Sequence, residues 1–329
     1  MVSFRTEIHP EASEFRISHE TKILFTGSCF TNNIGSFLKE HLFPVKINPF
    51  GVVYNPISVL NTMGILLDGE NFSEEDIDFA NEKWFSWDHH SSFSDPDKDE
   101  CLRKINQQIN ESSLHLKEAR FLLLTFGTSW VYRLKETGKI VTNCHKFPDS
   151  VFDRFMLTRD DIVIAWVNFL DELFTINPDL RVIFTVSPVR HWKEGAHGNQ
   201  LSKATLLLSV EEICNKFPEK TEYFPAYELL LDDLRDYRFY ADDLLHPSSQ
   251  AIEYILEKFS QTYFDNMTTE LIKEIHKLVQ AKNHRVYNES TASHKKFISS
   301  HLAVIKSLSS MYPFLNLKVF ENYFGQAGK

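Results

Sequence analysis

Two side chains that can act as nucleophiles stand next to each other near the start of the chain, in the segment Gly27-Ser28-Cys29. A hydroxyl or thiol at the start of a helix lies beside free backbone N–H groups and the positive end of the helix dipole. This position suits a nucleophile in acyl transfer. Each residue also has a structural interpretation, because Ser28 can cap a helix and Cys29 can be a small buried apolar side chain.

A second pair with chemical potential, Asp243 and His246, stands far along the chain and directly before Pro247. A carboxylate and an imidazole at this spacing can meet through a tight turn. The carboxylate then orients the imidazole, which can take a proton from a nucleophile. By itself the pattern more often marks an aspartate at a helix start beside a surface histidine, so it gains weight only from the candidate nucleophiles upstream.

Alternating strands and helices must position these groups. Three apolar runs predict buried strands, and amphipathic stretches predict helices between them. This alternation indicates parallel βαβ units and a three-layer α/β/α sandwich with a central, mostly parallel sheet. Sites in such sheets lie beyond the carboxyl ends of the strands. The predicted strands cover residues 22–26, 120–127 and 181–188, and they end at Gly27, Gly127 and Ser187.

The segments between these strands carry clear local signals. Residues 43–56 predict a rigid loop, because two Asn-Pro pairs bracket Gly51. Residues 130–142 predict a hairpin, and residues 192–202 predict a loop that contains glycine and histidine. Helices are predicted at 57–67, 99–119, 158–175, 203–217 and 249–264.

The composition changes after about residue 266, where two further amphipathic and lysine-rich helices are predicted at 268–282 and 294–311. We interpret them as a helical appendage, either a lid or an oligomer contact. We therefore predict two parts, an α/β domain over residues 1–265 and a C-terminal helical extension over residues 266–329. No oligomeric state follows from the sequence.

Composition excludes several classes of protein. The 329 residues are 43% hydrophobic and 24% charged, a balance that supports a packed core. The net charge of -10 argues against nucleic acid or an anionic membrane as a partner. The first residues lack the apolar stretch of a secretory signal, and no run approaches the roughly 18 apolar residues of a membrane span. The four cysteines form no C-x-x-C pair, so we expect free thiols and a cytoplasmic protein.

Other polar residues give weaker signals. Arg190 and His191 follow the third strand and can bind an anionic group of a substrate, or simply lie at the surface. Several histidines and one aspartate stand at spacings that match no standard ligand motif, so we expect no metal and no other cofactor. These residues are Asp88, His89, His90, His191, His197 and His246.

The segment Gly27-Ser-Cys-Phe-Thr31 resembles the signature of the GSCFA domain family, which belongs with the SGNH (GDSL-like) hydrolases. Thr31 departs from the alanine of that signature. The resemblance implies an SGNH hydrolase-like fold and chemistry on acyl esters, and it says less about the substrate. Five further segments resemble family blocks in the family's order over about residues 20–260: Asn48–Pro56, Gly127–Tyr132, Asn143–Lys146, Ser187–His191 and Phe239–Ser248.

The resemblance also implies roles for the catalytic candidates. The first SGNH block is Gly-Asp-Ser, and its alignment with residues 27–29 puts Cys29 at the nucleophile position. Ser28 remains the alternative if the turn shifts by one residue. Asp243 and His246 match the Asp-x-x-His of the last block.

The residues that would bind the oxyanion match the pattern less well. Gly51 resembles the glycine whose N–H binds the oxyanion, and residues 127–130 correspond to the Gly-x-Asn-Asp block that begins at Gly127. Ser129 stands where the block has its asparagine, which puts the side-chain donor in doubt. Asn143 or His145 can substitute, a hypothesis motivated only by their position after the predicted hairpin.

These observations predict an SGNH-type esterase, acyl hydrolase or acyltransferase with a Cys/Ser-His-Asp site. The expected substrate is a small-molecule or carbohydrate ester, with O-acetyl carbohydrate as a leaning taken from the family alone. The alternative is a non-catalytic glycan- or acyl-binding module whose SGNH site has degenerated.

Overall fold

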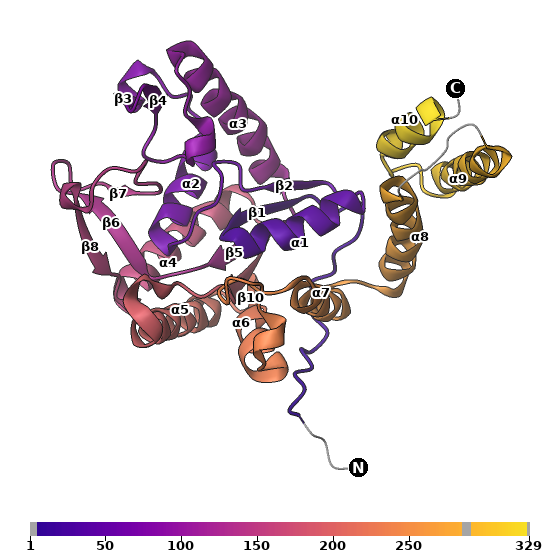
Figure 1. Cartoon of the computed structure of the whole chain (residues 1–329). Helices are drawn as coiled ribbons and strands as arrows, with labels where there is room; N and C mark the ends of the chain where they lie inside the picture. Colours follow the sequence, from indigo (N-terminus) through magenta and orange to yellow (C-terminus); the bar gives the residue numbers. More distant parts are fainter. Residues whose placement is uncertain (1–4, 285–290, 328–329) are drawn as a thin grey trace.

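A five-stranded parallel sheet lies at the centre of the computed structural model, which describes residues 5–284 and 291–327 (Figure 1). Its strand order is β10-β9-β5-β1-β2. Because every neighbouring pair is parallel, the carboxyl ends of all five strands meet at one edge. The strands are β1 (Ile23–Gly27), β2 (Val45–Ile47), β5 (Phe121–Phe126), β9 (Arg181–Val186) and β10 (Thr221–Tyr223).

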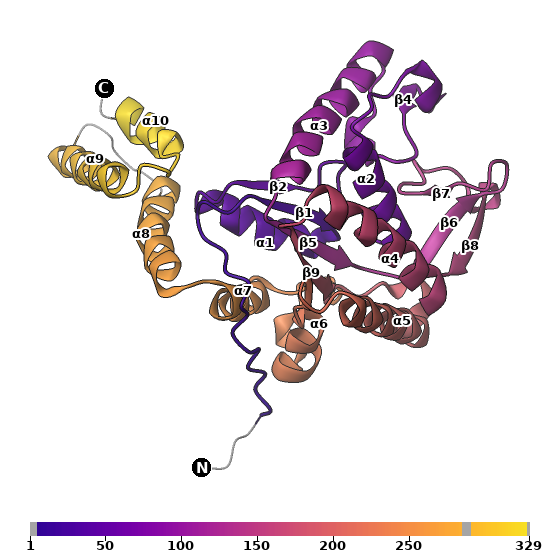
Figure 2. The ribbon, with the colours of Figure 1, turned by 180° about the vertical axis from the view of Figure 1, so that it is seen from behind.

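Helices cover both faces of this sheet (Figures 1 and 2). Alternate side chains of a strand point to opposite faces, so Leu24 faces one helical layer and its neighbour Phe25 faces the other. The predicted three-layer α/β/α sandwich is therefore confirmed. One layer contains α2 (Pro56–Asp68), α3 (Lys98–Glu118), α4 (Arg159–Ile176) and α5 (Gly195–Lys216), and the other contains α1 (Cys29–Glu40) and α7 (Ser249–Tyr263).

A second, antiparallel sheet of three strands follows the carboxyl end of β5 (Figure 1). Its order is β7-β6-β8, and it contains the predicted hairpin. Its strands are β6 (Trp130–Leu134), β7 (Ile140–Val141) and β8 (Phe152–Met156), while β3 (Asp78–Ala80) and β4 (Lys83–Phe85) form a separate hairpin.

Shorter helical segments join these elements. The short helix α6 (Ala226–Glu228) continues into a π-helical turn at Leu229–Leu234. Single 3-10 turns cover Glu74–Asp76, Ser91–Phe93, Asp149–Val151, Trp192–Glu194 and Tyr237–Phe239.

Two sequence predictions between residues 43 and 203 are wrong. Strand β2 lies inside the segment predicted as a loop, because three residues between two prolines suffice to pair with β1 at the sheet edge. Helix α5 begins at Gly195, not at residue 203. Its glycine-rich first turns are held by tertiary contacts, including the Asn199 side chain, which accepts the backbone N–H of His191 at 2.9 Å. Tertiary bonding here overrides the low helix propensity of glycine.

The C-terminal helices have an apolar core of their own. They are α8 (Asn266–Asn283), α9 (Ala292–Met311) and α10 (Lys318–Ala327), of which α10 was not predicted. Leu278, Ile305 and Phe320 belong to a cluster that is separate from both faces of the sheet. The domain boundary at residue 265 stays a prediction, and residues 1–4, 285–290, 328 and 329 lie outside the described residues.

A row of hydrogen bonds joins α8 to α1. The buried His41 ring bonds through Nδ1 to the carbonyl of Phe37 at 2.7 Å, and through Nε2 to Nδ1 of His276 at 3.1 Å. His276 Nε2 lies 2.9 Å from the side-chain nitrogen of Gln280. Among the helices of residues 5–284 and 291–327, none is both long enough and apolar enough to cross a membrane.

Candidate active site

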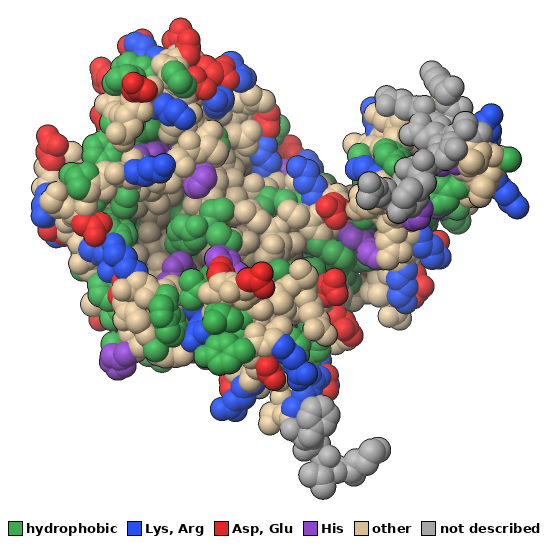
Figure 3. All heavy atoms as spheres, in the orientation of Figure 1, with side chains coloured by type: hydrophobic (Ala, Val, Ile, Leu, Met, Phe, Trp, Pro, Cys, Tyr) green, Lys and Arg blue, Asp and Glu red, His purple; other side chains and the backbone are tan. Residues whose placement is uncertain are grey.

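A cavity of about 530 Å³ opens at the carboxyl edge of the sheet. Figure 3 shows this face, where histidine side chains lie around a hollow in the surface. Its lining brings together residues that are far apart in the sequence: Cys29, Asn143, Arg190, His191 and His246 from the predicted site, with Tyr54, Thr128 and Trp130. A larger cavity of about 920 Å³ lies between the C-terminal helices and the loop after α1, and no predicted site residue lines it.

The turn between β1 and α1 separates the two candidate nucleophiles. Gly27 has a φ of 148°, and a Cβ there would lie 2.3 Å from the carbonyl oxygen of Thr125, so only glycine fits. Ser28 is buried, and its hydroxyl accepts the N–H of Phe30 at 3.3 Å as the cap of α1. Cys29, the first residue of the helix, lines the cavity instead. Its N–H belongs to the first turn, whose donors have no partner within the helix.

Asp243 and His246 form the turn that their spacing predicted. One Asp243 oxygen accepts the N–H groups of Leu245 and His246, each at 2.9 Å, and the other accepts His246 Nδ1 at 2.6 Å. The two backbone bonds and then the imidazole lower the pKa of Asp243 to about 2. The carboxylate therefore stays ionised and fixes the ring through Nδ1, and His246 lines the cavity.

The structure argues against an oxyanion role for Gly51 and Gly127. The N–H of Gly51 donates to the Asn48 carbonyl at 2.8 Å. The N–H groups of Gly127 and Thr128 donate to the carbonyl of Tyr54, at 2.8 and 3.1 Å. Because these donors already have acceptors, they are not free to bind an oxyanion.

Ser129 and His145 also point their polar atoms elsewhere. The Ser129 side chain is buried and donates to the Ser202 hydroxyl on α5 at 3.1 Å. The His145 ring bonds to the carbonyl of Ser86 at 2.9 Å, and His145 is absent from the cavity lining. Asn143 does line the cavity, and its side-chain oxygen accepts the N–H of His145 at 2.8 Å.

Arg190 connects the loop after β9 to the Asp-x-x-His turn. Its backbone N–H donates to the Leu245 carbonyl at 3.1 Å, and its guanidinium donates to the Leu244 carbonyl at 3.2 Å. The guanidinium also stacks over the Trp192 ring, 4.3 Å from its centroid. Arg190 therefore positions the turn that holds His246, besides offering a positive charge at the cavity.

His191 is a partly buried ring in the cavity wall. Burial, followed by the nearby Lys203, lowers the pKa of His191 to about 3, so it cannot bind an anion through a charge of its own. Its Nε2 is buried without a hydrogen-bond partner among the described residues. A Cβ on Gly127 would lie 2.9 Å from this nitrogen, so the glycine gives the ring its space.

Two residues of this region were missed from the sequence. Lys203 is buried and donates to the carbonyls of Gly127 and Ser187, at 2.6 Å each, which ties the ends of β5 and β9 together. Burial lowers the pKa of Lys203 to about 7. The hydroxyl of Tyr54 lies 3.6 Å from the Cys29 sulfur. Neither residue carries a local signal, because each role depends on contacts between distant segments.

The described residues offer no metal site. Within residues 5–284 and 291–327, no three or more His, Cys, Asp or Glu side chains gather in a way that could hold a metal ion. His89 illustrates the reason, since its ring is buried in apolar surroundings and packs against Phe50 at 4.0 Å between centroids.

Comparisons with known proteins place the chain in a family. Among solved structures it is similar to an acetyl xylan esterase, Est2A, from the rumen bacterium Butyrivibrio proteoclasticus, with 14% sequence identity and a TM-score of 0.35. The similarity covers 73% of this chain and 62% of the esterase, so the chain spans less than two thirds of that protein. No curated protein matches. Residues 275–327 match the "GSCFA domain protein, C-terminal domain", and residues 22–259 match the GSCFA family. The chain belongs to the GSCFA family.

Proposed function

We propose that this protein is an esterase or acyltransferase that uses Cys29 as its nucleophile and His246, oriented by Asp243, as its general base. One observation carries the proposal: the cavity is lined by both the thiol at the start of α1 and the imidazole held by Asp243. Ser28 does not compete, because its hydroxyl caps the helix and is buried. The likeness to an acetyl xylan esterase is too slight to support the proposal.

The reaction proceeds in two half-reactions. His246 Nε2 takes the proton of the Cys29 thiol, the sulfur bonds to the acyl carbon, and the C=O π pair moves to the oxygen. When the intermediate collapses, the ester C–O bond breaks and the leaving oxygen takes the proton from His246. A water or an acceptor hydroxyl then gives its proton to His246, and its oxygen attacks the thioester carbon. The S–C bond breaks, the acyl group leaves on that oxygen, and His246 returns the proton to the sulfur.

The free protein is not yet aligned for the first proton transfer. The Cys29 sulfur bonds to the Tyr54 hydroxyl, and no hydrogen bond joins it to His246. A rotation of the Cys29 side chain, or a bridging water, is needed before the thiol can lose its proton. Catalytic hydrogen bonds of this kind often tighten only when substrate is bound.

The finer parts of the proposal concern ancestry and substrate. The order Cys29, Asp243, His246 resembles the first and last SGNH blocks, which supports our proposal that the chain is related to that superfamily. The cavity wall contains aromatic rings, including Trp130, Tyr132 and Trp192, which suit a flat organic substrate. A small-molecule or carbohydrate ester, such as an O-acetylated sugar, is the substrate class that we propose.

Single substitutions tested on p-nitrophenyl acetate separate the two nucleophiles. We expect Cys29→Ala to lower kcat/KM by about 10³-fold or more, because no other group forms the thioester. Ser28→Ala should keep turnover within about threefold and lose about 1 kcal/mol of stability with the helix cap. Unchanged turnover in Cys29→Ala would refute the proposal. A protein that binds glycans but neither turns over esters nor forms an acyl-enzyme would be the binding module instead.

A further inference from the structure

The hydroxyl of Tyr54 lies beside the proposed nucleophile. It lies 3.6 Å from the Cys29 sulfur, and both residues line the cavity. The side chain is partly open to the cavity, since 38% of Tyr54 is exposed, so a substrate can reach it. We propose that the Tyr54 hydroxyl stabilises the oxyanion that forms when Cys29 attacks an ester. This inference rests on the proposed function, because it requires the attack by Cys29.

The backbone holds Tyr54 in place at the turn that follows β5. Its carbonyl accepts the N–H groups of Gly127 and Thr128, and the next residue, Asn55, caps α2 by accepting the N–H of Ser58 at 2.8 Å. The ring packs edge-on against His191, with centroids 5.5 Å apart. With the backbone and ring held in this way, only the O–H bond has to turn during the reaction, and this small reorganisation favours oxyanion stabilisation.

The turn held by Tyr54 is also the place where the SGNH pattern has its asparagine donor. Here Ser129 occupies that position and bonds to Ser202 on α5. The backbone donors of Gly51 and Gly127 have acceptors as well. Tyr54 therefore supplies a side-chain donor in a site where Ser129 and the N–H groups of Gly51 and Gly127 are engaged. The competing candidate is the side-chain nitrogen of Asn143, although no bond joins Asn143 to Cys29.

The protonation state of Tyr54 fits a donor. Burial, followed by the bond to Cys29, raises the pKa of the Tyr54 phenol, so the hydroxyl keeps its proton at neutral pH. In the thiolate form the O–H group points to the negative sulfur. As the S–C bond forms, the negative charge moves from the sulfur to the carbonyl oxygen, and the O–H group follows it. The proton stays on Tyr54 throughout, so no further acid or base is required.

The test separates ester attack from simple alkylation of the same thiol. Alkylation by iodoacetamide also uses the Cys29 thiolate, but it builds no oxyanion. We expect Tyr54→Phe to lower kcat for p-nitrophenyl acetate by about 10² to 10³-fold, the usual loss for one oxyanion donor. The limiting alkylation rate of Cys29 at high pH, followed by mass spectrometry, should change less than about fivefold.

Two controls complete the design. Tyr227→Phe removes a hydroxyl that bonds to Gln200 at 3.0 Å outside the cavity, and it should leave both rates within twofold. Asn143→Ala tests the competing donor. If this variant loses ester turnover and Tyr54→Phe does not, Asn143 stabilises the oxyanion instead of Tyr54. Equal losses of both reactions in Tyr54→Phe would show that the tyrosine acts on the thiol and not on the oxyanion.

The outcomes also separate this inference from the proposed function. If Cys29→Ala abolishes ester turnover and Tyr54→Phe leaves it within twofold, the proposed function stands and the role of Tyr54 is refuted. If Cys29→Ala retains turnover, the proposed function fails, and the role of Tyr54 fails with it. Thermal unfolding of each variant confirms that the compared proteins are folded.

Discussion

Helices α1 and α3 each have a cysteine in the first turn, and Cys29 of α1 lines the cavity of the proposed site. At the start of α3, Cys101 is buried and its thiol bonds to the carbonyl of Trp84 at 3.5 Å. Burial raises the pKa of Cys101 and keeps it a thiol. At the start of α1, Cys29 is partly exposed and its nearest polar partner is a hydroxyl. The difference lies in the surroundings, since both helices have a side-chain cap.

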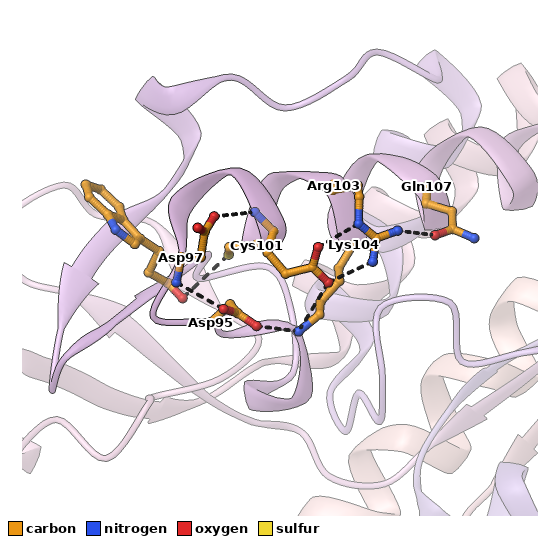
Figure 4. A network of polar contacts seen from close by, with 8 residues as sticks. Asp95, Asp97, Cys101, Arg103, Lys104 and Gln107 are labelled. Carbon is orange, nitrogen blue, oxygen red and sulfur yellow. Dashed lines mark hydrogen bonds and ion pairs between the residues drawn. The ribbon is translucent and has the colours of Figure 1, made fainter.

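Charged partners fill the start of α3 (Figure 4). Asp97 caps the helix by accepting the N–H of Glu100 at 2.9 Å, and Lys104 donates to Asp95 at 2.6 Å. Acidic residues in the first turn neutralise the positive end of the helix dipole. The first turn of α1 has no acidic residue. Its Phe30 and Thr31 N–H groups bond to Ser28, which leaves the N–H of Cys29 as the group that can act in the proposed site. A cysteine near a helix start is therefore a useful signal only when no acidic side chain neutralises that start.

We expect the largest loss of ester turnover when the Asp243–His246 pair is disrupted, because this pair is proposed to act with Cys29, whereas Cys101 has no such partner in the described part of the chain. We expect Asp243→Asn to lower kcat for p-nitrophenyl acetate by about 10³ to 10⁴-fold, because an amide no longer holds the His246 ring in its productive tautomer. Asp236→Asn is a matched control, since Asp236 also accepts a backbone N–H two residues on, from Arg238 at 3.0 Å, and lies outside the cavity. A loss of less than tenfold in Asp243→Asn would count against the proposed base.

A second contrast concerns two lysines. Asp95 raises the pKa of Lys104, whereas burial without a carboxylate lowers the pKa of Lys203 to about 7. The unfolded chain, with an ordinary lysine pKa near 10.5, therefore binds more protons than the native state between about pH 7 and 10. Stability should rise with pH in this window by up to about 1.4 kcal/mol per unit for this one proton.

Urea unfolding at pH 7 and pH 9.5 measures this effect. Lys203→Met should remove the lysine's share of the slope, while Lys104→Met should keep it, because Lys104 titrates above the window. Equal slopes in the wild type and Lys203→Met would show that the Lys203 ammonium is not destabilised by its burial. We also expect Lys203→Met to weaken ester turnover, since the carbonyls of Gly127 and Ser187 lose their common donor.

The smallest effect compares the two cysteines directly. Cys101→Ala should cost roughly 1 kcal/mol of stability from lost burial and keep ester turnover within twofold. Cys29→Ala should do the reverse and change stability by less than about 0.5 kcal/mol, as is usual for a partly exposed side chain. Thermal unfolding and p-nitrophenyl acetate turnover of the two variants check both halves. A Cys101→Ala protein that is as stable as the wild type but has lost ester turnover would contradict the structural role of Cys101.

The sequence predicts most of the fold because the apolar runs in β1, β5 and β9 are buried and form strands that need little context. It misses β2, whose three residues become a strand only by pairing with β1. It also misplaces the start of α5, because the glycines in its first turns have a low helix propensity. Packing against α4 stabilises the helix in spite of them.

The site divides in the same way. The turn of Asp243 and His246 is local, so its spacing predicts it well. The cap formed by Ser28 is local too, and was among the interpretations open from sequence. The N–H of Gly51 and the hydroxyl of Ser129 find their acceptors only in the folded chain. The contact between Tyr54 and Cys29 also depends on the whole fold, so no residue spacing in the sequence predicts these bonds.

The row of bonds between α1 and α8 has an orientation that follows from its first acceptor. A carbonyl can only accept, so the Phe37 oxygen requires a proton on Nδ1 of His41, and Nε2 of that neutral ring must then accept. His276 therefore carries its proton on Nδ1 and donates it in a hydrogen bond to His41. Its Nε2 accepts a hydrogen bond from the side-chain N–H of Gln280. A single main-chain oxygen thus dictates the tautomers of two imidazoles and the direction of an amide 243 positions later.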